Sequence, residues 1–98
     1  MIVTVHYGAD DKQETVKVPG SFTDWHTYAV EWAPDHVTVF LDGKAVFTTT
    51  TPGAVPTVPM HLAIQNDVGP LTNWIPARNA ETPDVVGLYV DWVRMYEY

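Results

Sequence analysis

The chain has 98 residues, a formal net charge of −7 and a hydrophobic content of 46%. This length corresponds to one small domain or to part of a larger one, and the apolar content is high enough for a core, which argues against disorder. The acidic balance argues against nucleic acid or an anionic membrane as a partner, because both are negatively charged. The absence of cysteine excludes disulfides and thiolate chemistry.

The first residues of the chain are predicted to form a strand. Val3, Val5 and Tyr7 alternate with more polar residues, which predicts a strand over residues 2–7. This start has no basic segment and no long apolar run, so we see no signal peptide. No stretch of the chain approaches the roughly 20 apolar residues of a membrane span.

A second, shorter strand is predicted over Glu14–Val18, and Pro19-Gly20 ends it. The segment that follows carries two aromatic residues, Phe22 and Trp25. We expect both rings in the core, because large aromatic side chains dominate the packing of small domains.

The densest strand signal lies in residues 26–48. Tyr28, Val30 and Trp32 alternate with smaller or polar residues, the period of a strand with two different faces. Pro34 interrupts this strand, because proline has no N–H to donate to a neighbouring strand.

A hairpin completes this region. The β-branched and aromatic residues of Val37–Leu41 predict a strand, and Asp42-Gly43 is a signal for a type I′ turn, which leads back into Lys44–Thr48. Counting outward from the turn predicts the pairs Leu41 with Lys44, Phe40 with Ala45, Val39 with Val46, and Thr38 with Phe47. This register places apolar groups on both faces, so we expect a layered β-structure.

Two more strands are predicted in the remainder of the chain, over residues 60–66 and 88–96. Residues 67–87 form an irregular loop of about 20 residues, a length that is usually functional or disordered. About seven strands and no convincing helix predict an all-β fold, an antiparallel β-sandwich.

Five segments, taken in order, resemble the C-terminal half of glycoside hydrolase family 16, the family of laminarinases and lichenases. They are TVHYG at residues 4–8, HTYAVEWAPD at 26–35, LDG at 41–43, PMHL at 59–62 and VDWVRMY at 90–96. The resemblance implies a concanavalin A-like jelly roll, of which residues 1–98 form the C-terminal portion of a single domain. It also implies hydrolysis of β-1,3 or mixed-linkage glucans and an extracellular location.

The chain departs from the family at its catalytic strand. The family carries its carboxylates on an E-x-D-x-E or E-x-D-x-x-E strand, and a retaining mechanism needs two of them about 5–5.5 Å apart. Neither pattern occurs in this sequence. We therefore expect an incomplete sandwich that is inactive as a separate chain. Its unpaired strand edges would favour self-association.

The resemblance points to two polar residues as part of a cleft wall. His6 lies opposite the core face of its strand, where the family has a histidine that looks into the cleft. Gln65 falls where the family often has an asparagine, and an amide both donates to and accepts from sugar hydroxyls. For each residue the alternative is an ordinary polar side chain on a solvent-facing surface.

Two further candidates lie in the last third of the chain. Trp74 is in the long loop and would stack on a sugar ring, or would cap the edge of the core. Asp91 matches a position that ligates a structural calcium ion in some family members. Because calcium takes about 6–8 oxygen ligands, a surface charge is the favoured interpretation of this single carboxylate, and no other cofactor is expected.

The remaining residues of chemical interest are predicted to be structural. Glu31 has no partner carboxylate in the sequence pattern and is interpreted as a surface charge, while Trp25, Trp32 and Trp92 are expected in the core. The four histidines show no spacing typical of a metal site.

Three functional hypotheses follow. The first is a partial β-glucan endohydrolase that contributes part of the cleft wall and no nucleophile. The second is a stand-alone carbohydrate-binding β-sandwich without catalysis, in which His6, Gln65 and Trp74 contact the glycan. The third is a polypeptide with no independent function. Fold analogy alone does not decide among them.

Overall fold

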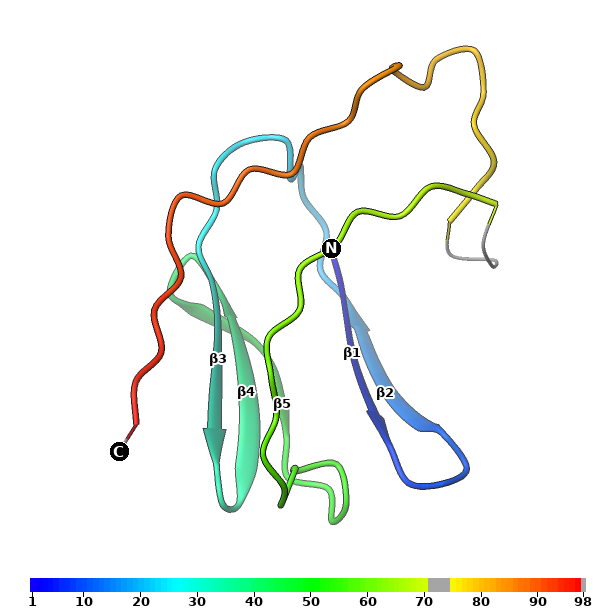
Figure 1. The fold of residues 1–98 in the computed structure, drawn as a ribbon. Helices are drawn as coiled ribbons and strands as arrows, with labels where there is room; N and C mark the ends of the chain where they lie inside the picture. Colours follow the sequence, from blue (N-terminus) through cyan, green and yellow to red (C-terminus); the bar gives the residue numbers. More distant parts are fainter. Residues whose placement is uncertain (71–74, 98) are drawn as a thin grey trace. The chain divides into compact units, whose positions relative to one another are not determined.

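The structure is a computed structural model that describes residues 1–70 and 75–97. The described residues form an all-β, antiparallel structure without a helix, as the sequence predicts. The strands are β1 (Ile2–Tyr7), β2 (Lys12–Lys17), β3 (Tyr28–Ala33), β4 (His36–Leu41) and β5 (Lys44–Thr49) (Figure 1). The chain divides into two units, Met1–Met60 and His61–Tyr98, and all five strands belong to the first.

The strands β1 and β2 form a two-stranded antiparallel sheet. The strand predicted over residues 2–7 is confirmed, whereas β2 begins two residues earlier than predicted. The open end of the hairpin is closed by the N-terminus. The Met1 ammonium donates to the carbonyl of Val18 at 2.9 Å, and the Val18 N–H donates back to the Met1 carbonyl at 2.9 Å.

The strands β3, β4 and β5 form a three-stranded antiparallel sheet in that order. The turn between β4 and β5 is of the predicted kind, because Asp42 has a φ of 51° and Gly43 a φ of 77°, and a type I′ turn needs positive φ at both positions. The pairs next to the turn, Leu41 with Lys44 and Phe40 with Ala45, are also confirmed.

Farther from the turn the predicted register is wrong by one residue. A shift of the β-bulge type lies between Val39 and Phe40, so that Val39 pairs with Phe47 and Thr38 with Thr48. The extra residue on β5 is Val46. A bulge inserts one residue into a strand without changing the sequence pattern on either side of it, so counting from the turn does not detect it.

The bulge separates the two faces of the sheet by polarity. It moves Phe47 onto the face of Val39 and Val37, and it moves Thr48 onto the opposite face beside Thr38. The expectation of apolar groups on both faces is therefore corrected for this part of the hairpin. Val37 is the most buried apolar residue of the sheet, with 8% of its surface exposed.

A histidine fastens the start of β3 to the neighbouring turn between β4 and β5. His26 Nδ1 lies 2.8 Å from Asp42 Oδ2, and His26 Nε2 lies 3.2 Å from the carbonyl oxygen of Ser21. Asp42 also accepts the Thr27 N–H through Oδ1 at 2.9 Å. Both ring nitrogens of His26 thus face acceptors, the arrangement of a protonated imidazole.

The tryptophans predicted in the core are exposed. Trp25, Trp32 and Trp92 expose 71%, 41% and 54% of their surfaces. Trp32 is held by its indole N–H, which donates to the Pro56 carbonyl at 2.9 Å. The physical reason is that each unit by itself provides little apolar cover for these rings. Val37 and Ala54 are the only buried hydrophobic residues among those that the structure describes.

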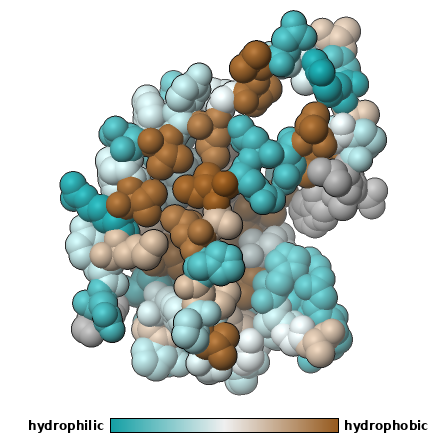
Figure 2. Space-filling view, in the orientation of Figure 1, coloured by the Kyte–Doolittle hydropathy of each residue, from teal (hydrophilic) through white to brown (hydrophobic). Residues whose placement is uncertain are grey.

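The last two predicted strands are not formed in the structure. Residues 60–66 and 88–96 contain no strand, and their apolar side chains are exposed, with values of 63% for Met60, 56% for Leu62 and 51% for Val90. Apolar side chains are correspondingly visible at the surface in Figure 2. The alternation of apolar and polar residues in 60–66 and 88–96 fits a strand. A strand also needs a hydrogen-bonded neighbour, and no described strand pairs with either of these segments.

We predict that Gly43→Ala lowers the free energy of unfolding by roughly 1 kcal/mol, because a Cβ disfavours positive φ. No atom lies within 4 Å of the added carbon, so the loss arises from the backbone alone. Gly43→Asn is the matched control, since asparagine tolerates this conformation. Urea unfolding measures both variants. An equal loss for Asn and Ala would contradict this account of the turn.

We predict that the His26–Asp42 pair is most stabilising between about pH 4 and pH 6.5. The hydrogen bond to Asp42 raises the pKa of His26 above its ordinary value, and the same bond lowers the pKa of Asp42. The histidine contribution is therefore complete below the unfolded-state value of about 6.5 and is lost as the pH rises through the folded-state pKa. The aspartate contribution is complete above about pH 4 and is lost on acidification.

The ring resonances of His26, followed by NMR during a pH titration, measure this directly. We expect a midpoint above about 6.5 in the natural sequence. Asp42→Asn should lower it, and Asp35→Asn, which removes an exposed carboxylate in the turn at the opposite end of β4, should leave it unchanged. A midpoint at or below the ordinary value would refute the role given to Asp42.

Candidate functional site

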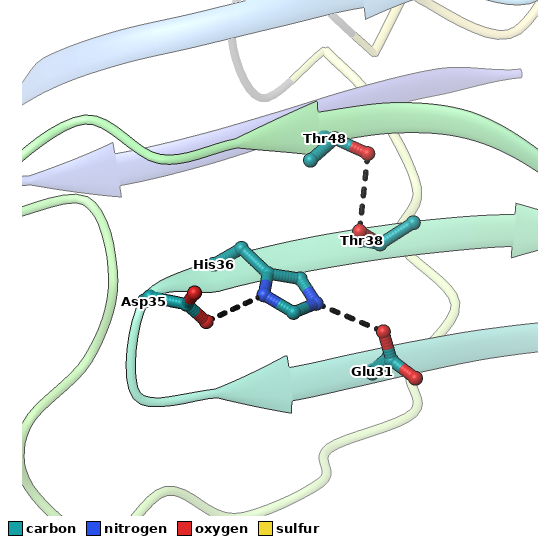
Figure 3. A network of polar contacts seen from close by, with 5 residues as sticks. All are labelled: Glu31, Asp35, His36, Thr38 and Thr48. Carbon is teal, nitrogen blue, oxygen red and sulfur yellow. Dashed lines mark hydrogen bonds and ion pairs between the residues drawn. The ribbon is translucent and has the colours of Figure 1, made fainter.

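One face of the three-stranded sheet, the face of Thr38 and Thr48, is called the polar face here. It carries a cluster of two carboxylates around one histidine (Figure 3). His36 begins β4 and Glu31 lies on β3, while Asp35 lies in the turn between them. His36 Nε2 is 2.9 Å from Glu31 Oε1, and His36 Nδ1 is 2.7 Å from Asp35 Oδ1. The interpretation of Glu31 as a surface charge is therefore incomplete, because this carboxylate binds His36.

The register of the β3–β4 hairpin explains this contact. Ala33 pairs with His36 and Glu31 pairs with Thr38, so Glu31 and His36 are diagonal neighbours on one face. The proline-containing two-residue turn brings Asp35 next to the ring. A search of the sequence for His and Glu placed diagonally across a short turn would find this pair, whereas a search for metal-ligand spacing among the histidines does not.

The electrostatics of the cluster favour an imidazolium between two carboxylates. The hydrogen bond to Glu31, and next the bond to Asp35, raises the pKa of His36, and the bond to His36 lowers the pKa of Asp35. A general base needs a ring nitrogen that can accept a proton, and a general acid needs a carboxyl group with a raised pKa. The contacts stabilise the charged forms of His36 and Asp35, so the cluster is suited to holding the hairpin together.

A further carboxylate, outside this cluster, is held by hydroxyl groups. The pKa of Glu14, on β2, is lowered by hydrogen bonds from the side chains of Thr51 and Thr49. The Tyr7 hydroxyl also donates to Glu14 Oε1 at 3.5 Å, and burial together with this carboxylate raises the pKa of Tyr7. Thr49 is 3% exposed. Glu14 thus joins the β1–β2 hairpin to the end of β5 as an ionised acceptor.

His6 lies on β1 with its ring exposed. Its Nδ1 is 2.8 Å from Asp11 Oδ1, and Gln13 Nε2 donates to Asp11 Oδ2 at 3.0 Å. The bond to His6 lowers the pKa of Asp11, which has a φ of 50° in the turn. One ring nitrogen therefore braces the β1–β2 turn. Within the described part of the chain, Nε2 of His6 has no hydrogen-bond partner.

The other predicted site residues lie in the second unit or outside the described residues. Gln65 is exposed and donates through Nε2 to Asp67 Oδ2 at 3.2 Å. Asp91 is also exposed. Trp74 lies outside the residues that the structure describes. The structure thus joins His6 to Asp11 and Gln65 to Asp67, each within its own unit, and the shared cleft wall stays a prediction.

The described residues 1–70 and 75–97 contain no group of three or more His, Cys, Asp or Glu side chains that could hold a metal ion. Asp91 alone offers one carboxylate, whereas calcium takes about 6–8 oxygen ligands. The described residues therefore do not make a calcium site, and the calcium ion implied at Asp91 stays an untested prediction. In the same part of the chain, no helix has the length and apolarity to cross a membrane.

The comparisons with known proteins identify a family. The sequence model described as Glycosyl hydrolases family 16 matches residues 2–93 of this 98-residue chain, a range that includes all five strands. No curated protein and no solved structure matches the chain significantly. The family match extends over far more than half of the sequence, and the all-β antiparallel structure is consistent with an incomplete sandwich of this kind. The chain therefore belongs to family 16 of the glycosyl hydrolases.

Proposed function

We propose that this chain forms part of the glycan-binding wall of a β-glucan endohydrolase and contributes no catalytic nucleophile. The observation that carries the proposal is the family match over residues 2–93, which supports a polysaccharide as the substrate in general. The choice of β-1,3 or mixed-linkage glucan rests on the resemblance of the sequence to laminarinases and lichenases. We also propose that the protein is secreted, because the resemblance to this family implies an extracellular location.

The proposed absence of a nucleophile rests on the sequence, and the proposed absence of a general acid is supported by the carboxylates as well. The sequence lacks the E-x-D-x-E and E-x-D-x-x-E patterns. In addition, Glu14, Asp35 and Asp42 have lowered pKa values because each accepts hydrogen bonds from neighbouring side chains. A glycosidase acid needs the opposite shift, because it must hold a proton near neutral pH.

Three residues are proposed to contact the glycan. His6 would use Nε2, since Nδ1 is engaged with Asp11, and Gln65 would use its amide oxygen, since Nε2 donates to Asp67. Both side chains are exposed. Stacking of Trp74 on a sugar ring rests on the sequence alone.

We predict that the purified chain releases no reducing sugar from laminarin or lichenan but binds laminarin weakly. Binding is measured by the change in tryptophan fluorescence during a laminarin titration. Trp74→Ala should weaken binding roughly two- to tenfold, the contribution typical of one aromatic contact. Trp25→Ala is the matched control, because it removes a different exposed tryptophan.

Each outcome has a distinct meaning. Hydrolysis by the purified chain that Glu31→Gln abolishes would disprove the absence of a catalytic carboxylate. No saturable binding, or equal losses for Trp74→Ala and Trp25→Ala, would disprove the proposed wall residues. Tight binding that Trp74→Ala abolishes, without hydrolysis, would instead favour a stand-alone carbohydrate-binding module.

A further inference from the structure

We propose that two copies of this chain associate by antiparallel pairing of β3 with β3, so that the two three-stranded sheets become one continuous sheet. The interaction surface is the outer edge of β3 together with the exposed row of Tyr28, Val30 and Trp32. The partner is a second copy of the same chain. This inference does not depend on the proposed glycan binding.

The outer edge of β3 is open among the described residues. The sheet order places β3 at one end, and β4 is the only one of the five described strands that is hydrogen-bonded to it. The Asp42 N–H donates to the Thr27 carbonyl, so the backbone groups of every second residue from Thr27 point toward β4. Those of Tyr28, Val30 and Trp32 consequently point to the free edge. Such a row of unpaired N–H and C=O groups is a template for another strand.

The other strand edges are less suited to pairing. β2 carries lysine at both ends, at Lys12 and Lys17, and charged lysines on an edge discourage pairing. β5 begins with Lys44 and ends at Thr49, which is 3% exposed. β1 has mostly half-buried side chains. β3 contains no lysine, arginine or proline, and Val30 exposes 67% of its surface.

The sequence of β3 is self-complementary around Val30. When Val30 of one copy faces Val30 of the other across a two-fold axis, Tyr28 faces Trp32 of the second copy on the same face of the sheet. Directly opposite aromatic residues are among the favourable cross-strand pairs. On the other face, Glu31 lies opposite Ala29. A register centred on Glu31 would instead oppose two like charges, which disfavours it.

The size and charge of this interface predict a weak association. The edge of one six-residue strand buries less surface than a standard protein–protein interface, so we expect a Kd on the order of 10–100 µM. Each chain also carries a net charge of −7, which opposes association at long range. Added salt screens this repulsion, so the dimer should become more stable as the salt concentration rises.

Sedimentation velocity of the full chain tests the proposal at low and high salt, about 0.05 M and about 0.5 M NaCl. We expect a monomer–dimer equilibrium with a larger dimer fraction at high salt. Val30→Lys places two ammonium groups opposite each other at the two-fold axis and should weaken the dimer at least tenfold. Ala45→Lys is the matched control, because it adds the same charge to the exposed surface of β5.

A charge-exchange experiment separates loss of pairing from loss of folding. Val30→Lys and Val30→Glu should each be monomeric, and an equimolar mixture should form a heterodimer, because lysine then lies opposite glutamate. A strictly monomeric natural chain would overturn the proposal. So would equal losses for Val30→Lys and Ala45→Lys, or a mixture that stays monomeric.

Discussion

The bulge between β4 and β5 is the constraint on which the three-stranded sheet depends. Without it, Phe47 would lie on the face that carries Thr38, and Thr48 would lie on the face that carries Val39. With it, the hydroxyls of Thr38 and Thr48 come within 3.0 Å of each other, and Phe47 joins the apolar face. One inserted residue thus places the two threonines together on one face and Phe47 with Val39 on the other.

Polar contacts at the ends of β3 compensate for a small apolar core. Domains of about 100 residues bury only a little more than 60% of their unfolded surface, and here most large apolar side chains remain exposed. Two histidine–carboxylate contacts hold the ends of β3 instead. His26 binds Asp42 before the strand begins, and His36 binds Glu31 near its end. Both contacts bridge backbone segments that the turns already place close together, so little chain entropy is lost in forming them.

The sequence predicts the local features well because local chemistry determines them. The alternation in residues 2–7 and the Asp42-Gly43 turn each depend on a few neighbouring residues, and both are confirmed. The family resemblance is confirmed too, because its motifs lie along nearly the whole chain. The bulge between β4 and β5 could not be predicted, since it depends on which side chains meet across two strands. The diagonal pair of Glu31 with His36 depends on that same kind of pairing.

The two strands predicted over residues 60–66 and 88–96 do not form, for a related reason. The alternation of apolar and polar residues in 60–66 and 88–96 favours a strand with one apolar face. It does not determine whether a neighbouring strand is present. A strand exists only with its hydrogen-bonded partner, whereas a turn or an ion pair can form from a few residues.

In the candidate site, the distinction is between carboxylates that stabilise the fold and carboxylates that could deliver a proton. In Asp11, Glu14, Asp35 and Asp42, hydrogen bonds stabilise the charged form, and the pKa is lowered in every case. A carboxylate whose charge stabilises the fold is poorly suited to deliver a proton to a leaving group, because protonation would break the contacts that hold it. Membership of a hydrolase family and an acidic composition are therefore not enough to assign catalysis to these carboxylates. Their engagement in turns and strand contacts gives these four carboxylates a structural role in the hairpins.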